Sequence, residues 1–264
     1  AHGREAWVGE SAGAFEQAAA PAAEAPQAAQ APQPPATRLS SNENPLGPSK
    51  AALAAIETAF AYAGRYPMNA QPAMADFQAL VAKKYGLGND QVALGTGSGE
   101  ILDAAVKAYT STERGLVSAA PSYEDPIGVA RRLGRPFIRV PVDAAGKLDL
   151  RTMIAAVKGQ GMMFFCNPNN PTATVHGSQA VADALTELSK TSPDTVVLMD
   201  EAYHEYVTDP AYRSAVTLIP QFKNMIVSRT MSKCYGMAGM RLGYVMGQAE
   251  TIATIGRWLM PISI

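Results

Sequence analysis

Residues 228–244 of the chain read SRTMSKCYGMAGMRLGY. The amine of Lys233 can form a Schiff base with an aldehyde cofactor. Thr230 and Ser232 place hydroxyls three and one residues before this lysine, and Arg241 follows it by eight residues. Two hydroxyls and a guanidinium fork can hold one phosphate, and the three glycines of the stretch let the backbone approach it closely. The pattern therefore predicts a site for a phosphate-bearing aldehyde; a surface loop with one Lys and one Arg is the alternative.

Around this stretch, short apolar runs alternate with amphipathic segments from residue 38 onward. The apolar runs predict buried strands at Gln91–Leu94, Gly115–Ala119, Pro136–Val140, Gly161–Cys166, Thr195–Met199, Asn224–Ser228 and Gly243–Met246. The amphipathic segments predict helices at Lys50–Ala63, Pro72–Tyr85, Gly99–Tyr109, Ile127–Leu133, Leu150–Val157, Ser178–Ser189 and Ala249–Met260. We therefore expect a three-layer α/β/α fold with a mostly parallel central sheet and functional sites at the strand carboxyl ends.

Composition limits the classes of function. The 264 residues are 47% hydrophobic and 17% charged, with a net charge of -1, which is typical of a soluble globular protein with a sizeable core. No run of Lys and Arg exceeds a pair, which argues against nucleic acid and membrane surfaces as partners. The two cysteines and three histidines show no spacing typical of metal ligands, so we expect no metal site. A cytoplasmic protein is the expectation, and export after removal of a signal sequence is the alternative.

The two ends of the chain differ from its middle. Residues 11–37 are mostly Ala, Pro, Gln and Glu, and such a segment buries too little apolar surface to offset the entropy of ordering it. We therefore divide the chain into a flexible tail at residues 1–37 and one large domain at 38–264. The last predicted helix runs into Pro261 and the final residues without a closing element, which indicates a chain truncated at its C-terminus.

Polar segments follow four of the predicted strands. They read GTGSGE at 95–100, PSY at 121–123, NPNNPT at 167–172 and DEAY at 200–203. A glycine-rich turn that opens a helix is a ready anion site, although alone it is as typical of an ordinary turn. Two Asn-Pro steps enforce turn or extended backbone at a strand end, where an amide can face a ligand.

Taken together and in this order, these motifs resemble those of pyridoxal-phosphate-dependent aminotransferases of fold type I, and most closely the histidinol-phosphate aminotransferase group. The resemblance covers essentially everything after the tail. It implies that pyridoxal 5'-phosphate is the cofactor and that Lys233 carries it. It also implies that Gly97, Ser98, Thr230, Ser232 and Arg241 hold its phosphate. A small C-terminal domain, present in that family, would be largely missing here.

The resemblance assigns the cofactor ring to four further residues. Tyr123 would stack on the ring, Asn170 would donate to its phenolic oxygen, and Tyr203 would contact the same oxygen. Asp200 would pair with the ring nitrogen, because a buried carboxylate keeps that nitrogen protonated and the ring a strong electron sink. The family motif is Asn-Pro-Thr-Gly, and this chain has Ala173 in place of the glycine, so we expect backbone there that suits a Cβ.

Two N-terminal motifs carry the resemblance to the histidinol-phosphate group. The segment SNENPLGP at 41–48 is similar to the arm that borders the substrate, which points to Asn42 and Glu43 as substrate residues. Tyr66, in an Arg-Tyr-Pro step, would reach the cofactor phosphate of the other subunit, which implies a homodimer.

The implied activity is transfer of an amino group between an amino acid, or an amino-alcohol phosphate such as histidinol phosphate, and a 2-oxo acid. Lys233, Asp200 and Tyr203 would be the catalytic residues. Two alternatives remain open. One is a Cα decarboxylase or lyase similar to threonine-phosphate decarboxylase, because that group shares these motifs. The other is a catalytically inactive fragment that retains the fold.

Overall fold

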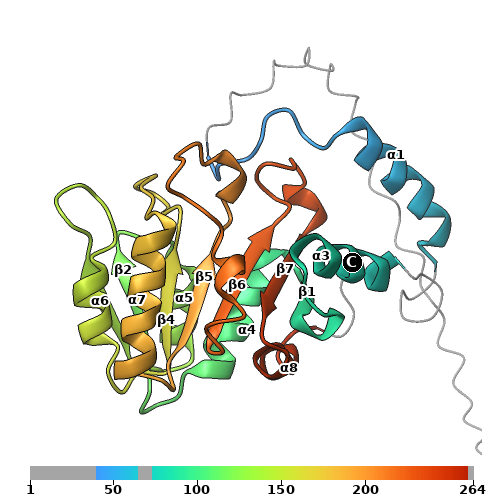
Figure 1. The fold of residues 1–264 in the computed structure, drawn as a ribbon. Coiled ribbons are helices and arrows are strands. Elements are labelled where there is room, and N and C mark those ends of the chain that lie inside the picture. The colour runs from blue at the N-terminus through green and yellow to red at the C-terminus, as the bar shows by residue number, and fades with distance from the viewer. Residues whose placement is uncertain (1–39, 65–72, 261–264) are drawn as a thin grey trace, which may run out of the picture. The chain divides into compact units, whose positions relative to one another are not determined.

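A single seven-stranded sheet forms the centre of the protein, in the order β1-β7-β6-β5-β4-β2-β3 (Figure 1). The computed structural model describes residues 40–64 and 73–260. The strands are β1 (Val92–Thr96), β2 (Leu116–Ala120), β3 (Phe137–Pro141), β4 (Met162–Cys166), β5 (Val196–Asp200), β6 (Met225–Thr230) and β7 (Leu242–Gly247). All seven predicted strands are confirmed, with ends shifted by one or two residues. The predicted tail at 1–37 lies outside the described residues.

Strand direction determines where a site can form. Strands β3, β2, β4, β5 and β6 pair in parallel, whereas β7 is antiparallel to both of its neighbours, β6 and β1. Strand β1 therefore runs in the same direction as β6. The carboxyl ends of six strands and the start of β7 consequently lie along one edge of the sheet.

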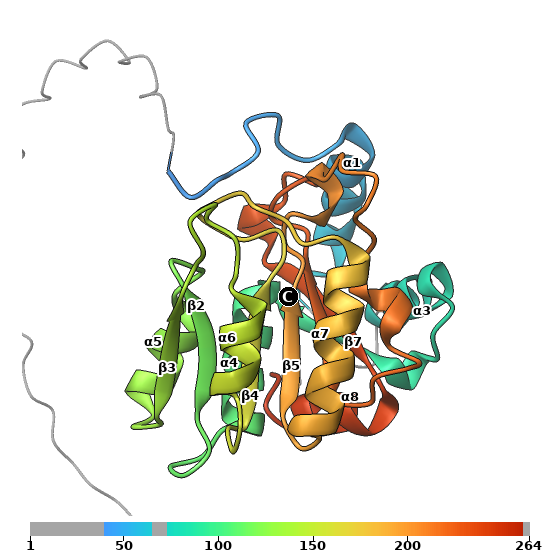
Figure 2. The same ribbon diagram turned by 60° about the vertical axis from the view of Figure 1, so that its left-hand side comes forward.

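Helices cover both faces of the sheet, which gives the predicted three layers. They are α3 (Ala73–Tyr85), α4 (Gly97–Tyr109), α5 (Asp125–Arg132), α6 (Leu150–Ala156), α7 (Ser178–Thr191) and α8 (Ala249–Gly256), and a further helix, α1 (Lys50–Ala59), buries none of its side chains. Helices α3, α6 and α7 contribute to the core on one face, and α4, α5 and α8 contribute to the core on the other. Figure 2 shows α6 and α7 in front of the sheet and α4 behind it.

Strand β4 illustrates why the sheet lies inside. Its sequence MMFFC is apolar at every position, and all five side chains are buried. Successive side chains of a strand point to opposite faces. Met163 and Phe165 accordingly join the α6 and α7 side of the core, whereas Met162 and Phe164 join the α4 and α5 side. A continuous apolar run is what a parallel strand covered on both faces requires.

All seven predicted helices are present, but each differs from its predicted range at one end or both, and three of the differences have a visible cause or consequence. Helix α1 ends at Ala59 and continues as a 3-10 helix over Phe60–Tyr62, and α4 begins two residues earlier than predicted, at Gly97. Helix α8 ends at Gly256, because the chain turns where the Trp258 amide donates to the Ile255 carbonyl at 2.9 Å. Apolar periodicity continues through such turns and does not mark them. Within the two described ranges, no helix is long and apolar enough to cross a membrane.

Candidate functional site

The predicted chemistry gathers at the edge where the parallel strands end. Asp200 is the last residue of β5, Lys233 follows the end of β6 by three residues, and Gly97 directly follows β1. Arg241 immediately precedes β7. Because β7 runs antiparallel, its beginning lies beside the carboxyl ends of its neighbours. Four segments distant in sequence therefore meet at one place.

A cavity of about 560 Å³ opens at this edge. Its lining contains these predicted residues: Asn42, Glu43, Ser98, Tyr123, Asn170, Asp200, Tyr203, Thr230, Ser232, Lys233 and Arg241. Gly97 is not in the lining but lies directly behind Arg241. Tyr66 falls in 65–72, outside the described residues. Among the lining residues that the structure describes, Lys233 and Arg241 are the cations.

Hydroxyls and a guanidinium cluster on one side of the cavity. The Thr230 hydroxyl donates to the Ser232 hydroxyl at 2.9 Å, and Nη1 of Arg241 approaches the same oxygen at 3.4 Å. Nη1 of Arg241 also donates to the carbonyl of Ala238 at 2.9 Å. Arg241 has a φ of 54°, in the left-handed region that a non-glycine residue rarely adopts. Such strain is typical of functional sites, and here it accompanies a guanidinium that faces the cavity.

The turn between β1 and α4 fits an anion. Gly97 has a φ of 75°, and a Cβ at this position would lie 2.3 Å from Nη2 of Arg241. A Cβ on Gly243 would lie 2.6 Å from the amide nitrogen of Ser98. Glycines at both positions therefore let Arg241 and the start of α4 come together. Thr96, the residue that precedes α4, makes no side-chain cap hydrogen bond. The positive end of the helix and the nearby donors fit a phosphate.

Asp200 lies buried at the base of the cavity, and its Oδ1 accepts a hydrogen bond of 2.9 Å from the Ser228 hydroxyl. Burial raises the pKa of Asp200 to about 6, against the lowering effect of Ser228, and the charge of Glu201 raises it further while Lys233 lowers it. A buried carboxylate that faces a cavity is stabilised by a cationic N–H partner. The protonated nitrogen of a pyridine ring supplies such a partner, so the site fits the expected cofactor.

The N-terminal arm, residues 40–48, reaches Lys233. Nζ of Lys233 donates to the carbonyl of Ser41 at 2.8 Å, and Nδ2 of Asn42 donates to the Tyr203 hydroxyl at 3.0 Å. Burial lowers the pKa of Lys233, and Arg241 lowers it further, whereas Glu43 and Asp200 raise it. A lowered pKa increases the neutral fraction of the amine, which is the nucleophilic form.

The 167–172 turn separates two neighbouring asparagines. Asn169 is buried, and it accepts from the Ser122 hydroxyl at 2.8 Å and donates to the Pro121 carbonyl at 3.1 Å. Asn170 instead lines the cavity, which is the position that the sequence predicted for it. Tyr123 also lines the cavity, and its hydroxyl donates to Oδ2 of Asp125 at 2.5 Å. Asn169 thus holds the turn in place through its hydrogen bonds, and Asn170 lines the cavity.

One expectation about this turn is wrong. We expected the backbone at Ala173 to suit a Cβ, but its φ is 54°, in the region that favours glycine. The conformation is fixed by the turn, in which the Ala173 amide donates to the carbonyl of Asn169 at 2.8 Å. Ala173 is therefore strained by roughly 1 kcal/mol.

Sequence reasoning missed several residues around the cavity. Ser228 was predicted only as part of a strand, yet its spacing of two from Thr230 places both on one face of β6. Arg229, on the other face, is a charged residue within a buried strand, and the structure pairs it with Glu201 at 2.7 Å. The available signal was an arginine and a glutamate that each follow an apolar run closely. Asp125 carried no signal that distinguished it from an ordinary helix-starting residue.

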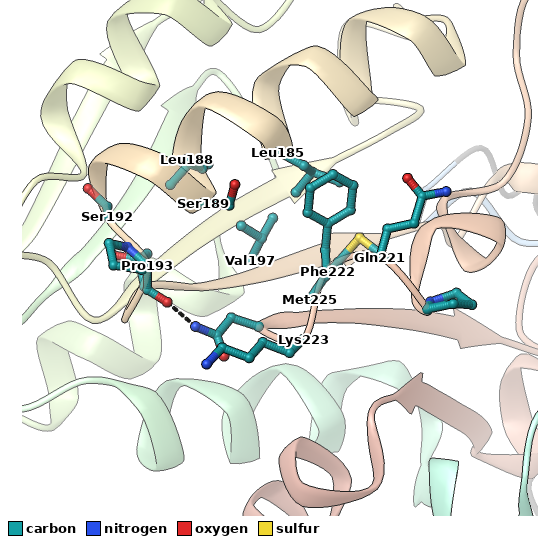
Figure 3. A pocket seen from close by; sticks show the side chains of 13 residues that line it. Leu185, Leu188, Ser189, Ser192, Pro193, Val197, Gln221, Phe222, Lys223 and Met225 are labelled. Carbon is teal, nitrogen blue, oxygen red and sulfur yellow. Dashed lines mark hydrogen bonds between the residues drawn. The ribbon is translucent and has the colours of Figure 1, made fainter.

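A second cavity, of about 320 Å³, lies at the opposite edge of the sheet, where β5 and β6 begin (Figure 3). Leu185, Leu188 and Phe222 supply much of its lining, and Asn224 donates to the Pro193 carbonyl at its rim. It contains none of the predicted site residues. Within residues 40–64 and 73–260, no group of three or more His, Cys, Asp or Glu is arranged to hold a metal ion.

Curated proteins similar to the chain include histidinol-phosphate aminotransferases and an aromatic amino acid aminotransferase. The chain is 33% identical over 228 residues to histidinol-phosphate aminotransferase 2 of Nitrosospira multiformis, which covers 86% of this chain and 56% of that protein. It is 36% identical over 229 residues to an aromatic amino acid aminotransferase of Thermobifida fusca, which covers 86% of this chain and 62% of that protein. The chain thus spans roughly three fifths of the length of these relatives.

Solved structures agree with this relationship. Histidinol-phosphate aminotransferase from Sinorhizobium meliloti, in complex with pyridoxal-5'-phosphate, superposes with a TM-score of 0.74 at 26% identity, over 82% of this chain and 57% of that one. The enzyme of the same name from Clostridium acetobutylicum gives a TM-score of 0.72 at 25% identity, over 84% and 64% of the two chains. The family model for aminotransferase class I and II matches residues 34–264. The chain therefore belongs to the aminotransferase class I and II family.

Proposed function

We propose that the protein is a pyridoxal-phosphate-dependent aminotransferase. One observation carries the proposal: the amine of Lys233, the buried carboxylate of Asp200 and the Thr230, Ser232 and Arg241 cluster line one cavity. An aldehyde, a ring nitrogen and a phosphate are the three groups that these side chains suit. Membership of the family and the relatives' names support the same conclusion.

Pyridoxal phosphate, when bound, supplies an electron sink for negative charge at Cα of an amino acid. Lys233 would hold the cofactor aldehyde covalently. Once released, Nζ of Lys233 would serve as the base that takes the proton from the substrate Cα and as the acid that gives it back. Its lowered pKa suits this exchange, because general acid–base catalysis is most efficient when the pKa lies near the working pH.

The remaining residues bind and orient the cofactor. Asp200 would keep the ring nitrogen protonated, and Asn170 and Tyr203 would bond the phenolic oxygen. Arg241, with the Thr230 and Ser232 hydroxyls and the start of α4, would anchor the phosphate. Tyr123 would stack on the ring.

For the substrates, we propose an amino donor of the histidinol phosphate or aromatic amino acid type and a 2-oxo acid acceptor. The names of the relatives support both donor types. The cofactor would engage Lys233 and Arg241, the two cations of the described lining. A phosphate on the donor and a substrate carboxylate each need a further cationic partner, so substrate choice rests on residues beyond this described lining.

We also propose that the protein is a homodimer in which helix α1 and the turn that follows it pack on the partner. Helix α1 buries none of its side chains, and Leu53 and Phe60 are 51% and 69% exposed. Apolar side chains gathered on one exposed segment are typical of a surface that a second chain covers. If the protein sediments as a monomer with full activity, this part of the proposal is wrong.

Steady-state kinetics test the proposed reaction. The protein, loaded with pyridoxal phosphate, is assayed with 2-oxoglutarate and histidinol phosphate, phenylalanine or leucine. If histidinol phosphate is the donor, kcat/KM should be highest with it. Equal kcat/KM values for histidinol phosphate, phenylalanine and leucine would instead indicate a transaminase of broad specificity. Release of carbon dioxide without amino transfer would indicate a decarboxylase instead. Absence of bound cofactor and of any turnover would contradict the proposed function itself.

A further inference from the structure

A buried ion pair lies behind the cavity, on the opposite face of the sheet from Asp200. Arg229 is 1% exposed and Glu201 is also 1% exposed. Nε of Arg229 donates to Oε2 of Glu201 at 2.8 Å, and Nη2 lies 2.7 Å from the same oxygen. Two charges removed from water in this way cost several kcal/mol unless they are paired and hydrogen-bonded. This pair is the most deeply buried ionic contact in the described part of the chain.

The pair faces away from the cavity because strand side chains alternate. Glu201 follows Asp200 directly, and Arg229 follows Ser228 directly. Asp200 and Ser228 are partners in the β5–β6 ladder and are hydrogen-bonded on the cavity side. Arg229 lies on the α3 side, where its guanidinium carbon is 5.7 Å from the centre of the Tyr85 ring. One step along each strand thus separates the ion pair from the Asp200–Ser228 pair.

The ion pair also fixes the chain that continues from Asp200. Nη1 of Arg229 reaches Oε1 of Glu205 at 3.4 Å, and Nη2 donates to the Ser214 hydroxyl at 2.9 Å. Glu201 in turn accepts from the Ser214 hydroxyl at 2.8 Å and from the Ala215 amide at 2.7 Å. Tyr203 lies between the two glutamates in sequence. A single arginine therefore connects both ends of the short segment that presents Asp200 and Tyr203 to the cavity.

We propose that Arg229 and Glu201 form a positioning pair that acts on Asp200 and Tyr203 from behind the sheet. The inference rests on the proposed function. The geometry brings two consequences: the guanidinium holds residues 200–206 in place, and its positive charge offsets the negative charge of Glu201 directly behind Asp200. Neither residue lines the cavity, so neither touches the cofactor or the substrate.

The electrostatic surroundings agree with this role. Burial alone would lower the pKa of Arg229, but Glu201, Tyr85 and Tyr244 raise it, so the guanidinium stays charged. Burial raises the pKa of Glu201, whereas Arg229 and the hydrogen bonds from Ala215 and Ser214 lower it. The other titratable groups near Arg229 are Glu205, His204 and Tyr212. The titratable groups that affect Asp200 or are affected by it are Glu201 from behind the sheet and Lys233, Tyr203, Tyr123 and Cys166.

Three variants of the protein test the inference. Arg229→Met leaves the glutamates without their partner, Glu201→Gln removes the negative charge with little change in shape, and the double variant removes both charges. Each is loaded with pyridoxal phosphate, and the pH midpoint of the bound cofactor's absorbance is measured together with the cofactor Kd. Urea unfolding of the cofactor-free proteins reports stability separately. Arg139→Met, which breaks the exposed pair with Glu124, is the control and should change none of these quantities.

The single variants should shift the pH midpoint in opposite directions. An uncompensated negative charge favours the protonated cofactor, so Arg229→Met raises the midpoint, and the surplus positive charge in Glu201→Gln lowers it, each by about one pH unit. In the double variant, the pH midpoint should lie within about 0.3 of a pH unit of the wild-type midpoint, because both charges are gone. Its cofactor Kd should be about tenfold weaker than that of wild type, because residues 200–206 are no longer held in place. If Arg229→Met does not fold, the midpoint and Kd of Glu201→Gln and of the double variant still test the positioning role.

The outcomes separate the two claims. Wild-type protein that takes up no cofactor contradicts the proposed function. Wild-type protein that binds cofactor normally, with variants that change only urea stability and leave midpoint and Kd unchanged, contradicts the positioning role. Shifts of the same sign in both single variants also contradict it, because they would report a general loss of structure.

Discussion

Gly97 and Arg241 lie 144 positions apart in the sequence, yet a Cβ on Gly97 would approach Nη2 of Arg241 to 2.3 Å. The glycine turn and the guanidinium therefore belong to one site. The turn directs the start of α4 toward the cavity, and the guanidinium adds a positive charge to the same place. Both features are what a phosphate requires.

Gly97→Ala should therefore damage both the fold and the site. A methyl group here would collide with Arg241, and the φ of 75° strains any side chain. We expect a loss of about 2 kcal/mol in the free energy of unfolding and a cofactor Kd weaker by at least tenfold. Urea denaturation and equilibrium dialysis measure the two effects. Gly128→Ala, inside α5 and away from the cavity, is the matched control, because a Cβ there meets only Nη1 of Arg132 at 3.5 Å, and it should be neutral or stabilising.

Arg241→Lys tests the guanidinium fork itself. Lysine keeps the charge but loses the planar pair of donors, so we expect cofactor affinity to fall by about 10- to 100-fold with little change in stability. Arg257→Lys, at an exposed position on the end of α8, serves as the control. An unchanged Kd in Arg241→Lys would mean that the phosphate is held elsewhere.

The sequence was sufficient for the strands because apolar runs mark them locally, whereas most cavity residues were predicted through the resemblance to a known family. Apolar runs such as 162–166 are buried on both faces, and the polar segments that follow them reach one edge through the topology of parallel strands. Arg241 was predictable only through the motif, since nothing local places a residue before β7 beside Asp200. The antiparallel direction of β7 does so, and strand direction depends on pairing across the whole sheet.

The contacts of the arm and of the Arg229–Glu201 ion pair could not be predicted from the sequence, for a different reason. The bond from Lys233 to the Ser41 carbonyl involves a backbone atom that every residue possesses, so no residue type signals it. The pairing of Arg229 with Glu201 depends on the register of β5 against β6. The strain at Ala173 was missed because the motif suggests a residue type and not a dihedral angle.

Ionised Asp200 should lower the free energy of unfolding of the cofactor-free protein at neutral pH. Its folded pKa of about 6 lies above the unfolded value of about 3.9, so the folded state favours the protonated carboxyl. The stability that this protonation contributes is present below about pH 4 and is lost as the pH rises through 6. Asp200→Asn should therefore be more stable than wild type by about 2 kcal/mol at pH 7.5, with a much smaller difference at pH 4.

Urea denaturation of the cofactor-free proteins at both pH values measures this difference. Asp194→Asn, which makes the same chemical change at an exposed position, is the control. A constant difference between Asp200→Asn and wild type would mean that Asp200 does not titrate as its burial indicates.

Ala173→Gly should stabilise the protein. Glycine relieves the left-handed strain at Ala173, which outweighs the entropy that glycine adds to the unfolded chain, so we expect a gain of about 0.5 kcal/mol. Ala253→Gly, in the exposed interior of α8, makes the same chemical change in helical backbone and should cost about 1 kcal/mol. Thermal unfolding of the two variants beside wild type should give shifts of opposite sign.

Lys233 is proposed to carry the cofactor, and covalent trapping tests this assignment. The protein is incubated with pyridoxal phosphate, reduced with borohydride and digested, and the peptides are mapped by mass spectrometry. We expect a phosphopyridoxyl group on the peptide that contains Lys233, and no label in a Lys233→Ala variant. A label on Lys223 or Lys190, or an unlabelled wild-type protein, would contradict it.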